Sequence, residues 1–116
     1  MRSVFIDPGR FRSALVLEEV ALTPDGQGGH DESWSEAATV LALVEPISAT
    51  SRFGADQTLE TATHRITLRA RSGVASGSLA SGKRFRKGDR IFEIVTVHDP
   101  DESGRYMVCR TREVGR

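Results

Sequence analysis

Apolar and polar residues alternate most regularly in residues 61–71, which have the sequence TATHRITLRAR. Successive side chains of a strand point to opposite faces, so one side of this segment carries apolar residues and the other basic or polar ones. The pattern predicts a half-buried antiparallel strand that begins near His64. The apolar side is Ile66, Leu68 and Ala70, and the opposite side is Arg65, Thr67, Arg69 and Arg71.

Four further segments have strand character and are separated by turn-forming residues. Residues 13–22 are apolar and end at the turn TPDGQGG, although their Leu, Ala and Glu content leaves a helix as the competing interpretation. The chain resumes with SWSEAATVLALVEP, and the apolar run 39–44 within it should end at Pro46, because proline cannot donate to a sheet ladder. The segments RIFEIVTVHD and RYMVCRTREV flank the turn PDESGR and predict a closing hairpin.

Three less regular segments complete the chain. Residues 46–63 are expected to be a long loop, with one helical turn near residues 55–59 as an option, and loops of this length are commonly functional. Residues 72–90 are expected to be a Gly/Ser-rich basic loop, and residues 1–11 an N-terminal arm. The predicted fold class is all-β. It is a single domain over residues 1–116, a small antiparallel β-barrel or sandwich of about five to six strands with one long loop and at most a short helix.

Composition fits a single globular domain, with 116 residues of which 38% are hydrophobic and 28% charged. The apolar runs are far shorter than the roughly 20 residues that span a bilayer, and the N-terminus lacks a signal core, so no membrane association is expected. Charge is uneven: residues 1–60 hold four Lys/Arg and ten Asp/Glu, and residues 61–116 hold twelve and six. Either these charges mix on one surface, or an acidic flank meets the basic flank of a neighbouring copy, a head-to-tail contact that generates rings.

Residues with catalytic or metal-binding chemistry are few and lack partners in the sequence. The single cysteine, Cys109, excludes an internal disulfide, and its alternating surroundings predict a buried packing role. The triplet HDE at residues 30–32 has metal-binding atoms but no supporting framework, and His64 and His98 near strand ends are interpreted as hydrogen-bonded or solvated. DGQGG lacks the ending of a phosphate loop, and no serine stands in a G-x-S-x-G elbow. No enzymatic activity, cofactor or metal is expected.

Basic residues gather around Phe85, downstream of the arginines of the alternating strand. Such residues can neutralise phosphates without recognising a base sequence. A solvated loop that protects a sheet edge is the other interpretation. Aromatic residues make up only 6% of the chain, which argues against a dedicated single-strand binder that stacks bases. The candidate DNA-proximal or inter-subunit residues are Arg65, Arg69, Arg71, Lys83, Arg84, Arg86 and Lys87.

Several motifs occur together in a defined order. Pro8-Gly9 precedes the first strand, DGQGGHDESW forms an Asp-x-x-Gly-Gly-x-x-x-x-Trp hairpin, and VLALVEPIS closes an apolar strand on Glu-Pro. THRITLR and GDRIFEIVTVHDPDESGRYMVC follow. In this order and spacing the chain resembles the phage head-tail joining family, also called head-closure, stopper or head-tail adaptor proteins, and the equivalent components of gene transfer agents. The resemblance covers nearly the whole chain. It departs at Leu41, where the family commonly has tryptophan, and in the basic segment 72–90.

The resemblance implies a barrel that forms a homo-oligomeric ring below the portal and its adaptor. Such a stopper ring retains packaged double-stranded DNA and docks the tail proteins below it. Its place is the neck of a phage or gene transfer agent particle, and the protein is made in the bacterial cytoplasm. In related connectors the loop between the second and third strands can project toward the channel and act as a gate, and by position this loop is residues 46–63 here. The candidate channel residues in this loop are Ser48, Thr50, Arg52, Phe53 and Gln57.

Two alternatives stay open at this stage. The chain would also suit a tail-completion component of the same particle, lower in the stack. A small barrel that binds nucleic acid in the cell is the third hypothesis, and it predicts a strongly salt-dependent DNA affinity that falls when Arg84 and Arg86 are changed to alanine.

Overall fold

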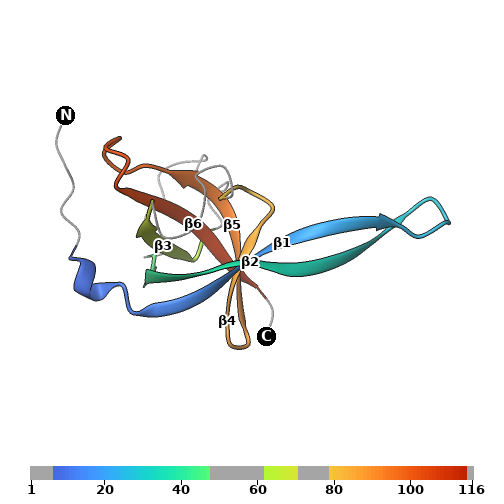
Figure 1. Cartoon of the computed structure of the whole chain (residues 1–116), viewed down its shortest axis with the longest axis horizontal. Coiled ribbons are helices and arrows are strands. Elements are labelled where there is room, and N and C mark those ends of the chain that lie inside the picture. The colour runs from blue at the N-terminus through green and yellow to red at the C-terminus, as the bar shows by residue number, and fades with distance from the viewer. Residues whose placement is uncertain (1–6, 48–61, 71–78, 115–116) are drawn as a thin grey trace, which may run out of the picture.

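Six antiparallel strands form a closed barrel in the order β1-β2-β3-β6-β5-β4 (Figure 1). The computed structural model describes residues 7–47, 62–70 and 79–114. Its elements are a short 3-10 turn η1 (Pro8–Arg10) and strands β1 (Ser13–Pro24), β2 (His30–Pro46), β3 (His64–Arg69), β4 (Arg84–Lys87), β5 (Arg90–His98) and β6 (Tyr106–Val114). The predicted all-β antiparallel fold class is confirmed. No helix in the described part of the chain is long and apolar enough to span a membrane.

The strands with clear sequence patterns lie where they are expected. β1 replaces the competing helix and pairs with β2 across the turn, in which the Asp25 carboxylate accepts hydrogen bonds from the backbone N–H groups of Gln27 and Gly29 at 2.7 and 3.1 Å. β2 ends at Pro46, and β5 and β6 pair as the predicted hairpin. Both β1 and β2 run further than their apolar segments, because the polar residues between those segments continue the ladder.

Two expectations are corrected. The segment 72–90 is not all loop, because β4 lies within it. This strand has a single inward residue, Phe85, which is fully buried and pairs with Phe92 on β5, so its alternation is too short to be recognised. Ala70 is not in the core. It lies in a turn after β3, partly exposed, where its N–H bonds to the Arg105 carbonyl at 2.9 Å. Of the predicted long loop, residues 46–63, the part from 48 to 61 lies outside the described residues, and so does the optional helical turn near residues 55–59.

The core fills the inside of the barrel with side chains from every strand. Ile66 and Leu68 of β3 are fully buried, as the alternation predicts, and so is Cys109 of β6. Thr111 is also buried, and its hydroxyl donates to the His64 carbonyl at 3.0 Å, which satisfies a polar group that would otherwise destabilise the core. The remaining members of the cluster are Leu15, Leu17, Val40, Ala42, Leu79, Phe85, Phe92 and Ile94.

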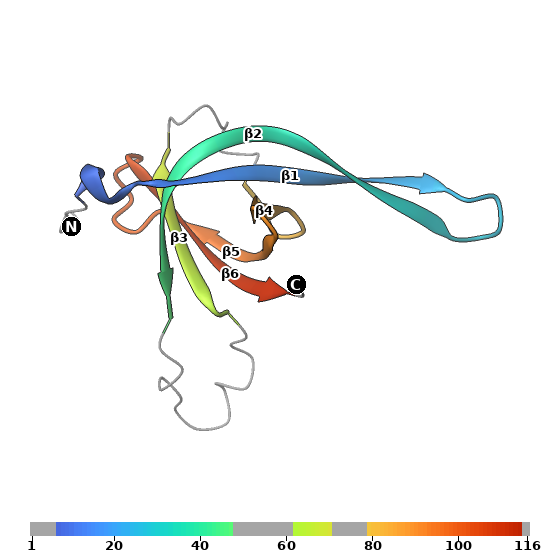
Figure 2. The ribbon, with the colours of Figure 1, turned by 90° about the horizontal axis from the view of Figure 1, so that it is seen from below.

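β1 and β2 continue past the barrel as a two-stranded ribbon, which we call the hairpin arm (residues 18–36). β4 pairs with β1 only at residues 16–18, and β3 pairs with β2 only at residues 42–46, so beyond Glu18 the two strands of the arm pair only with each other. The pairing shifts by one residue between Leu17 and Glu18, and such a bulge bends and twists a ribbon. The arm leaves the barrel at this bulge and extends the molecule to 52 Å along its longest axis (Figures 1 and 2).

Candidate functional site

The root of the hairpin arm is held by one buried carboxylate. Glu18 of β1 is only 6% exposed and accepts hydrogen bonds from Arg84 at 2.7 Å and from Arg86 at 2.8 Å, both on β4. Arg86 also reaches Glu36 on the other strand of the arm at 3.1 Å. The Arg84 guanidinium lies 3.8 Å from the centre of the Trp34 ring, a cation–π contact. The root thus ties both strands of the arm to β4.

These contacts determine the protonation states of Glu18 and Arg86. Burial alone would raise the pKa of Glu18, but the hydrogen bonds and charges of Arg86 and Arg84 outweigh it and lower that pKa below the usual carboxyl value. The same carboxylate, together with Glu36, raises the pKa of Arg86. Glu18 is therefore ionised at neutral pH, where it pairs with both arginines.

The structure places the predicted basic residues on different surfaces. Arg84 and Arg86 are used at the arm root, and Lys83 lies 3.9 Å from Glu19 of the arm. Lys87 contacts the Ser13 hydroxyl at 3.4 Å. Arg65 and Arg69 lie on β3, away from this cluster, and Arg65 pairs with Glu45 at 3.2 Å. Arg71 and the candidate channel residues Ser48, Thr50, Arg52, Phe53 and Gln57 lie outside the described residues.

The rest of the hairpin arm is acidic and exposed. Residues 18–36 contain six Asp or Glu residues and no Lys or Arg. Leu22 pairs directly with Glu32 and Val20 with Trp34, and directly paired residues of antiparallel strands share one face. The Leu22 side chain is 58% exposed, one of two large apolar side chains that the described structure leaves on the surface. The arm therefore presents an apolar strip with acidic residues beside it.

An arginine-lined groove of about 430 Å³ lies at the other end of the molecule. Its walls come from η1, the outer faces of β2, β3 and β6, and the turn after β5. Arg10 and Arg65 share the single carboxylate of Glu45, at 3.7 and 3.2 Å. The lining residues are Asp7, Arg10, Leu43, Glu45, Arg65, Thr67, His98, Pro100, Val108 and Arg110.

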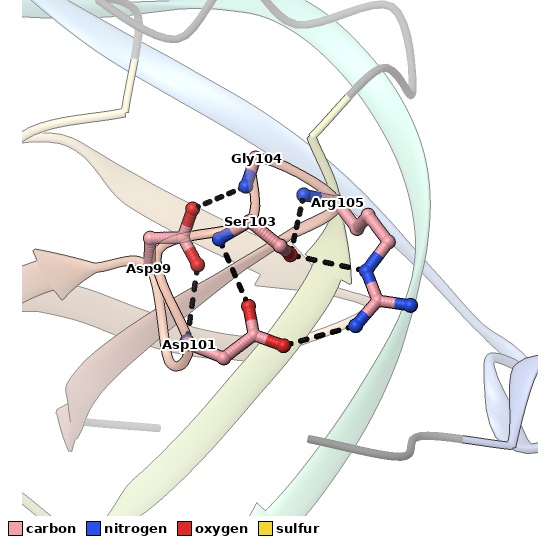
Figure 3. Close-up of polar contacts among 5 residues, drawn as sticks. All are labelled: Asp99, Asp101, Ser103, Gly104 and Arg105. Carbon is pink, nitrogen blue, oxygen red and sulfur yellow. Dashed lines mark hydrogen bonds and ion pairs between the residues drawn. The ribbon is translucent and has the colours of Figure 1, made fainter. Parts of the chain in front are cut away.

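The turn between β5 and β6 supports one wall of this groove and is built from its own side chains (Figure 3). Asp99 accepts hydrogen bonds from the N–H groups of Asp101 and Gly104 at 3.2 and 2.7 Å, and Asp101 accepts one from Ser103 N–H at 3.0 Å. The spacing D-x-D-x-S-G resembles the first half of a calcium loop, with Ser103 where that motif has Asp or Asn.

The positive charge next to these carboxylates comes from an arginine of the turn itself. The Arg105 guanidinium lies 3.0 Å from the fully buried Asp101 carboxylate and also donates to the Ser103 hydroxyl at 3.0 Å (Figure 3). Every carboxylate oxygen of Asp99 and Asp101 therefore has a partner in the turn. Across residues 7–47, 62–70 and 79–114, no group of three or more His, Cys, Asp or Glu side chains is placed to hold a metal ion. The turn is a structural element.

His64 and Cys109, two residue types that can take part in catalysis, are both packed into the barrel. The His64 ring lies edge-on to Phe92 with ring centres 5.1 Å apart, and its Nδ1 contacts the Thr63 hydroxyl at 2.9 Å. Burial lowers the pKa of His64, and the opposing charge of Glu113 only partly offsets this. Burial raises the pKa of Cys109 to about 12, so the thiolate that nucleophilic or redox chemistry needs is suppressed.

Comparisons with known proteins agree with this architecture. Residues 6–114 match the model of a family described as phage head completion protein. A chain from a solved structure described as the virion of a native gene transfer agent particle is 34% identical. That similarity covers 90% of this chain and 96% of that chain, with a TM-score of 0.66. No curated protein matches.

These matches span the barrel and the hairpin arm together. They confirm the resemblance drawn from the sequence motifs and the expected location in a phage or gene transfer agent particle. The chain therefore belongs to the phage head completion protein family, whose members are structural components of the virion.

Proposed function

We propose that this protein is the head-tail connector, or stopper, of its particle. Several copies form a ring below the portal and adaptor, retain the packaged double-stranded DNA, and offer the tail its docking surface. Family membership and the similar chain from a gene transfer agent virion support a head-completion role of this kind. The proposed role involves positioning and sealing rather than catalysis.

The observation that carries the ring proposal is the hairpin arm. An isolated two-stranded hairpin is at best marginally stable in water, because it lacks a third strand or a packed face. Its free edges are also a template for unwanted pairing. This chain nevertheless extends such a ribbon well beyond its barrel (Figure 2). The ribbon also leaves Leu22 exposed. A subunit with this shape is completed by other subunits.

Electron microscopy of particles that carry the protein tests this role. The proposal expects a ring of barrels between the portal-adaptor assembly and the first tail ring, with the DNA end held above it. Density at the lower end of the tail-completion assembly would instead support the tail-completion alternative. Particles with the protein scattered on the capsid surface would contradict both.

The proposal includes residues 46–63 as the part that faces the channel. The two ends of this segment lie side by side in the described part of the chain. Ile47 N–H donates to the Thr63 carbonyl at 2.9 Å, and Thr63 N–H donates to the Thr111 carbonyl at 2.7 Å. Replacing residues 49–60 with a short Gly/Ser linker should therefore leave the barrel folded. We expect such particles to assemble but to lose DNA.

This deletion has a clear readout. Particle DNA can be measured by nuclease protection, and folding of the purified variant by its thermal unfolding. A replacement linker of the original length, with the same Gly/Ser composition, is the matched control for loop length. Full DNA retention in the shortened variant would show that residues 46–63 do not contribute to the seal.

The nucleic-acid-binding alternative is less well supported by the contacts. Arg84 and Arg86, which it relies on, are engaged by Glu18, and Arg86 also by Glu36. Their replacement by alanine should mainly destabilise the arm root. A strongly salt-dependent DNA affinity of the isolated protein, lost in these variants without loss of stability, would support the alternative.

A further inference from the structure

One face of the hairpin arm carries apolar side chains that are not fully covered by the rest of the subunit, which suits a binding partner. Val20, Trp34 and Glu32 overhang a hollow of about 450 Å³ between the arm and the barrel wall around Lys83 and Glu93. Leu22 continues the same face toward the tip and is largely exposed. Apolar side chains along an open hollow lack the stabilisation that a packed partner would supply.

The charge of the arm is only partly neutralised within the subunit. Arg84 and Arg86 pair with Glu18 and Glu36 at the root. Toward the tip, no ion pair with another described residue engages the carboxylates Asp25, Asp31 and Glu32. The distal half of the arm is thus negative along its whole length.

The groove at the opposite end has complementary chemistry. Its lining includes the apolar residues Leu43, Val108 and Pro100, which we call its floor and against which an apolar side chain can pack. Arg10 and Arg65 surround this floor, and they share one carboxylate. The Arg10 side chain is 60% exposed, so a carboxylate of another molecule has access to it.

From these surfaces we infer that the hairpin arm of one copy clasps the η1 end of the next copy. Leu22 packs on the apolar floor of the neighbour's groove, and the carboxylates near the tip, Glu32 first among them, pair with the neighbour's Arg10 and Arg65. The occupant of the groove is a second copy of this chain. The inference rests on the proposed ring and specifies the contact that builds it.

The placement of the two surfaces fits a ring. η1 lies at one extreme of the long axis and the tip of the arm at the other, in both views (Figures 1 and 2). A contact between two different surfaces at opposite ends of a subunit is heterologous, and it closes into a ring when the rotation per subunit divides a full turn.

A charge exchange tests the contact. The Glu32→Arg variant has an altered arm and a native groove. The Arg10→Glu variant has a native arm and an altered groove. We expect each variant alone to self-associate roughly tenfold more weakly than wild type, because like charges then meet at the contact. An equimolar mixture should recover the wild-type association, since each altered arm then finds an altered groove and each native arm a native groove.

Sedimentation velocity of the full-length protein at low salt, over a wide concentration range, measures this association. Asp89→Arg is the matched control for Glu32→Arg, because Asp89 is also exposed, changes the net charge equally, and lies in the β4–β5 turn. Leu22→Ser tests the apolar part of the contact without altering charge and should also weaken association. Thermal unfolding of each variant establishes that it folds.

The outcomes separate this inference from the proposed function. A mixture that associates no better than its components overturns the arm-to-groove contact, as does a wild-type protein that stays monomeric at all concentrations. A ring seen in particles in which the arm contacts only an adaptor or tail protein also overturns it, while the connector role stands. Absence of the protein from the neck removes the connector role itself.

Discussion

Glu18 is the buried carboxylate at the root of the hairpin arm. It follows the bulge, it is nearly fully buried, and it joins β1 to two arginines of β4 at the point where the hairpin arm leaves the barrel. A buried carboxylate without partners would be strongly unfavourable, whereas this one has two charge-assisted hydrogen bonds. Its side chain fixes the direction of the arm relative to the barrel.

Replacing this carboxylate should destabilise the protein in a pH-dependent manner. Because the pKa of Glu18 is lower in the folded state, its contribution is fully present above the ordinary carboxyl value near 4.5 and is lost as the pH falls through the lowered folded value. At pH 7 we expect Glu18→Gln to lower the thermal midpoint by roughly 4–8 °C. The gap between variant and wild type should narrow by pH 3, as thermal scans at both pH values would show.

Glu45→Gln is the matched control for this substitution. Glu45 is also a strand carboxylate that pairs with two arginines, but its partners Arg10 and Arg65 are largely exposed. Exposed ion pairs contribute little to stability, so its effect should be small. Equal effects for the two variants, or a gap for Glu18→Gln that does not change with pH, would contradict the assignment of a special role to Glu18.

Among the elements, the β5–β6 turn is the most completely specified by its own residues. Gly104 adopts a φ of 80°, in the left-handed region, and its N–H is bonded to Asp99. Open space surrounds the position where a side chain would begin, so only the backbone conformation restricts this residue. The turn thus needs glycine for its conformation and not for its size.

Gly104→Ala should therefore lose about 1–2 kcal/mol of folding free energy, from backbone strain alone. Gly104→Asn should lose less, because asparagine tolerates the left-handed region. Urea unfolding of the two variants measures the difference. A loss in Gly104→Asn equal to or greater than that in Gly104→Ala would show that the backbone conformation is not the controlling factor.

The elements also show which parts of the structure can be predicted from the sequence. β3, β5 and β6 have long alternating patterns, so their existence and core faces could be predicted. β4 has one apolar residue and depends on the strands beside it. The arm root could not be predicted, because Glu18 and Arg84 are 66 residues apart and a local sequence pattern does not indicate a long-range ion pair. The groove likewise combines residues from η1, β2, β3 and β6.

At the scale of the whole molecule, barrel and arm are expected to be separable. The core cluster contains no residue of the arm, although Ala38 at its base packs against that cluster. A variant in which residues 20–34 are replaced by a two-residue Asn-Gly turn should keep a folded barrel and lose self-association. This variant lacks Trp34, the only tryptophan, so tryptophan fluorescence cannot report its folding and another probe is needed.

Cys109 provides that signal. It is the only cysteine, it is fully buried, and its raised pKa makes it unreactive in the folded barrel. We expect the thiol of the arm-deleted variant to resist a thiol reagent at pH 8 as well as wild type does, and to react once in denaturant. Rapid labelling without denaturant would mean that the barrel needs its arm to fold.

The pairing of β1 with β4 has a consequence for how assembly and folding are connected. This seam closes the barrel with only three residue pairs, and it joins segments far apart in the chain, so we expect it to form late and to open more readily than the other seams. The same three positions adjoin the root of the arm. Any neighbour that holds the arm therefore also holds the seam shut, and a bound state that excludes the opened form gains stability by mass action. Each subunit would then become harder to unfold as its ring closes.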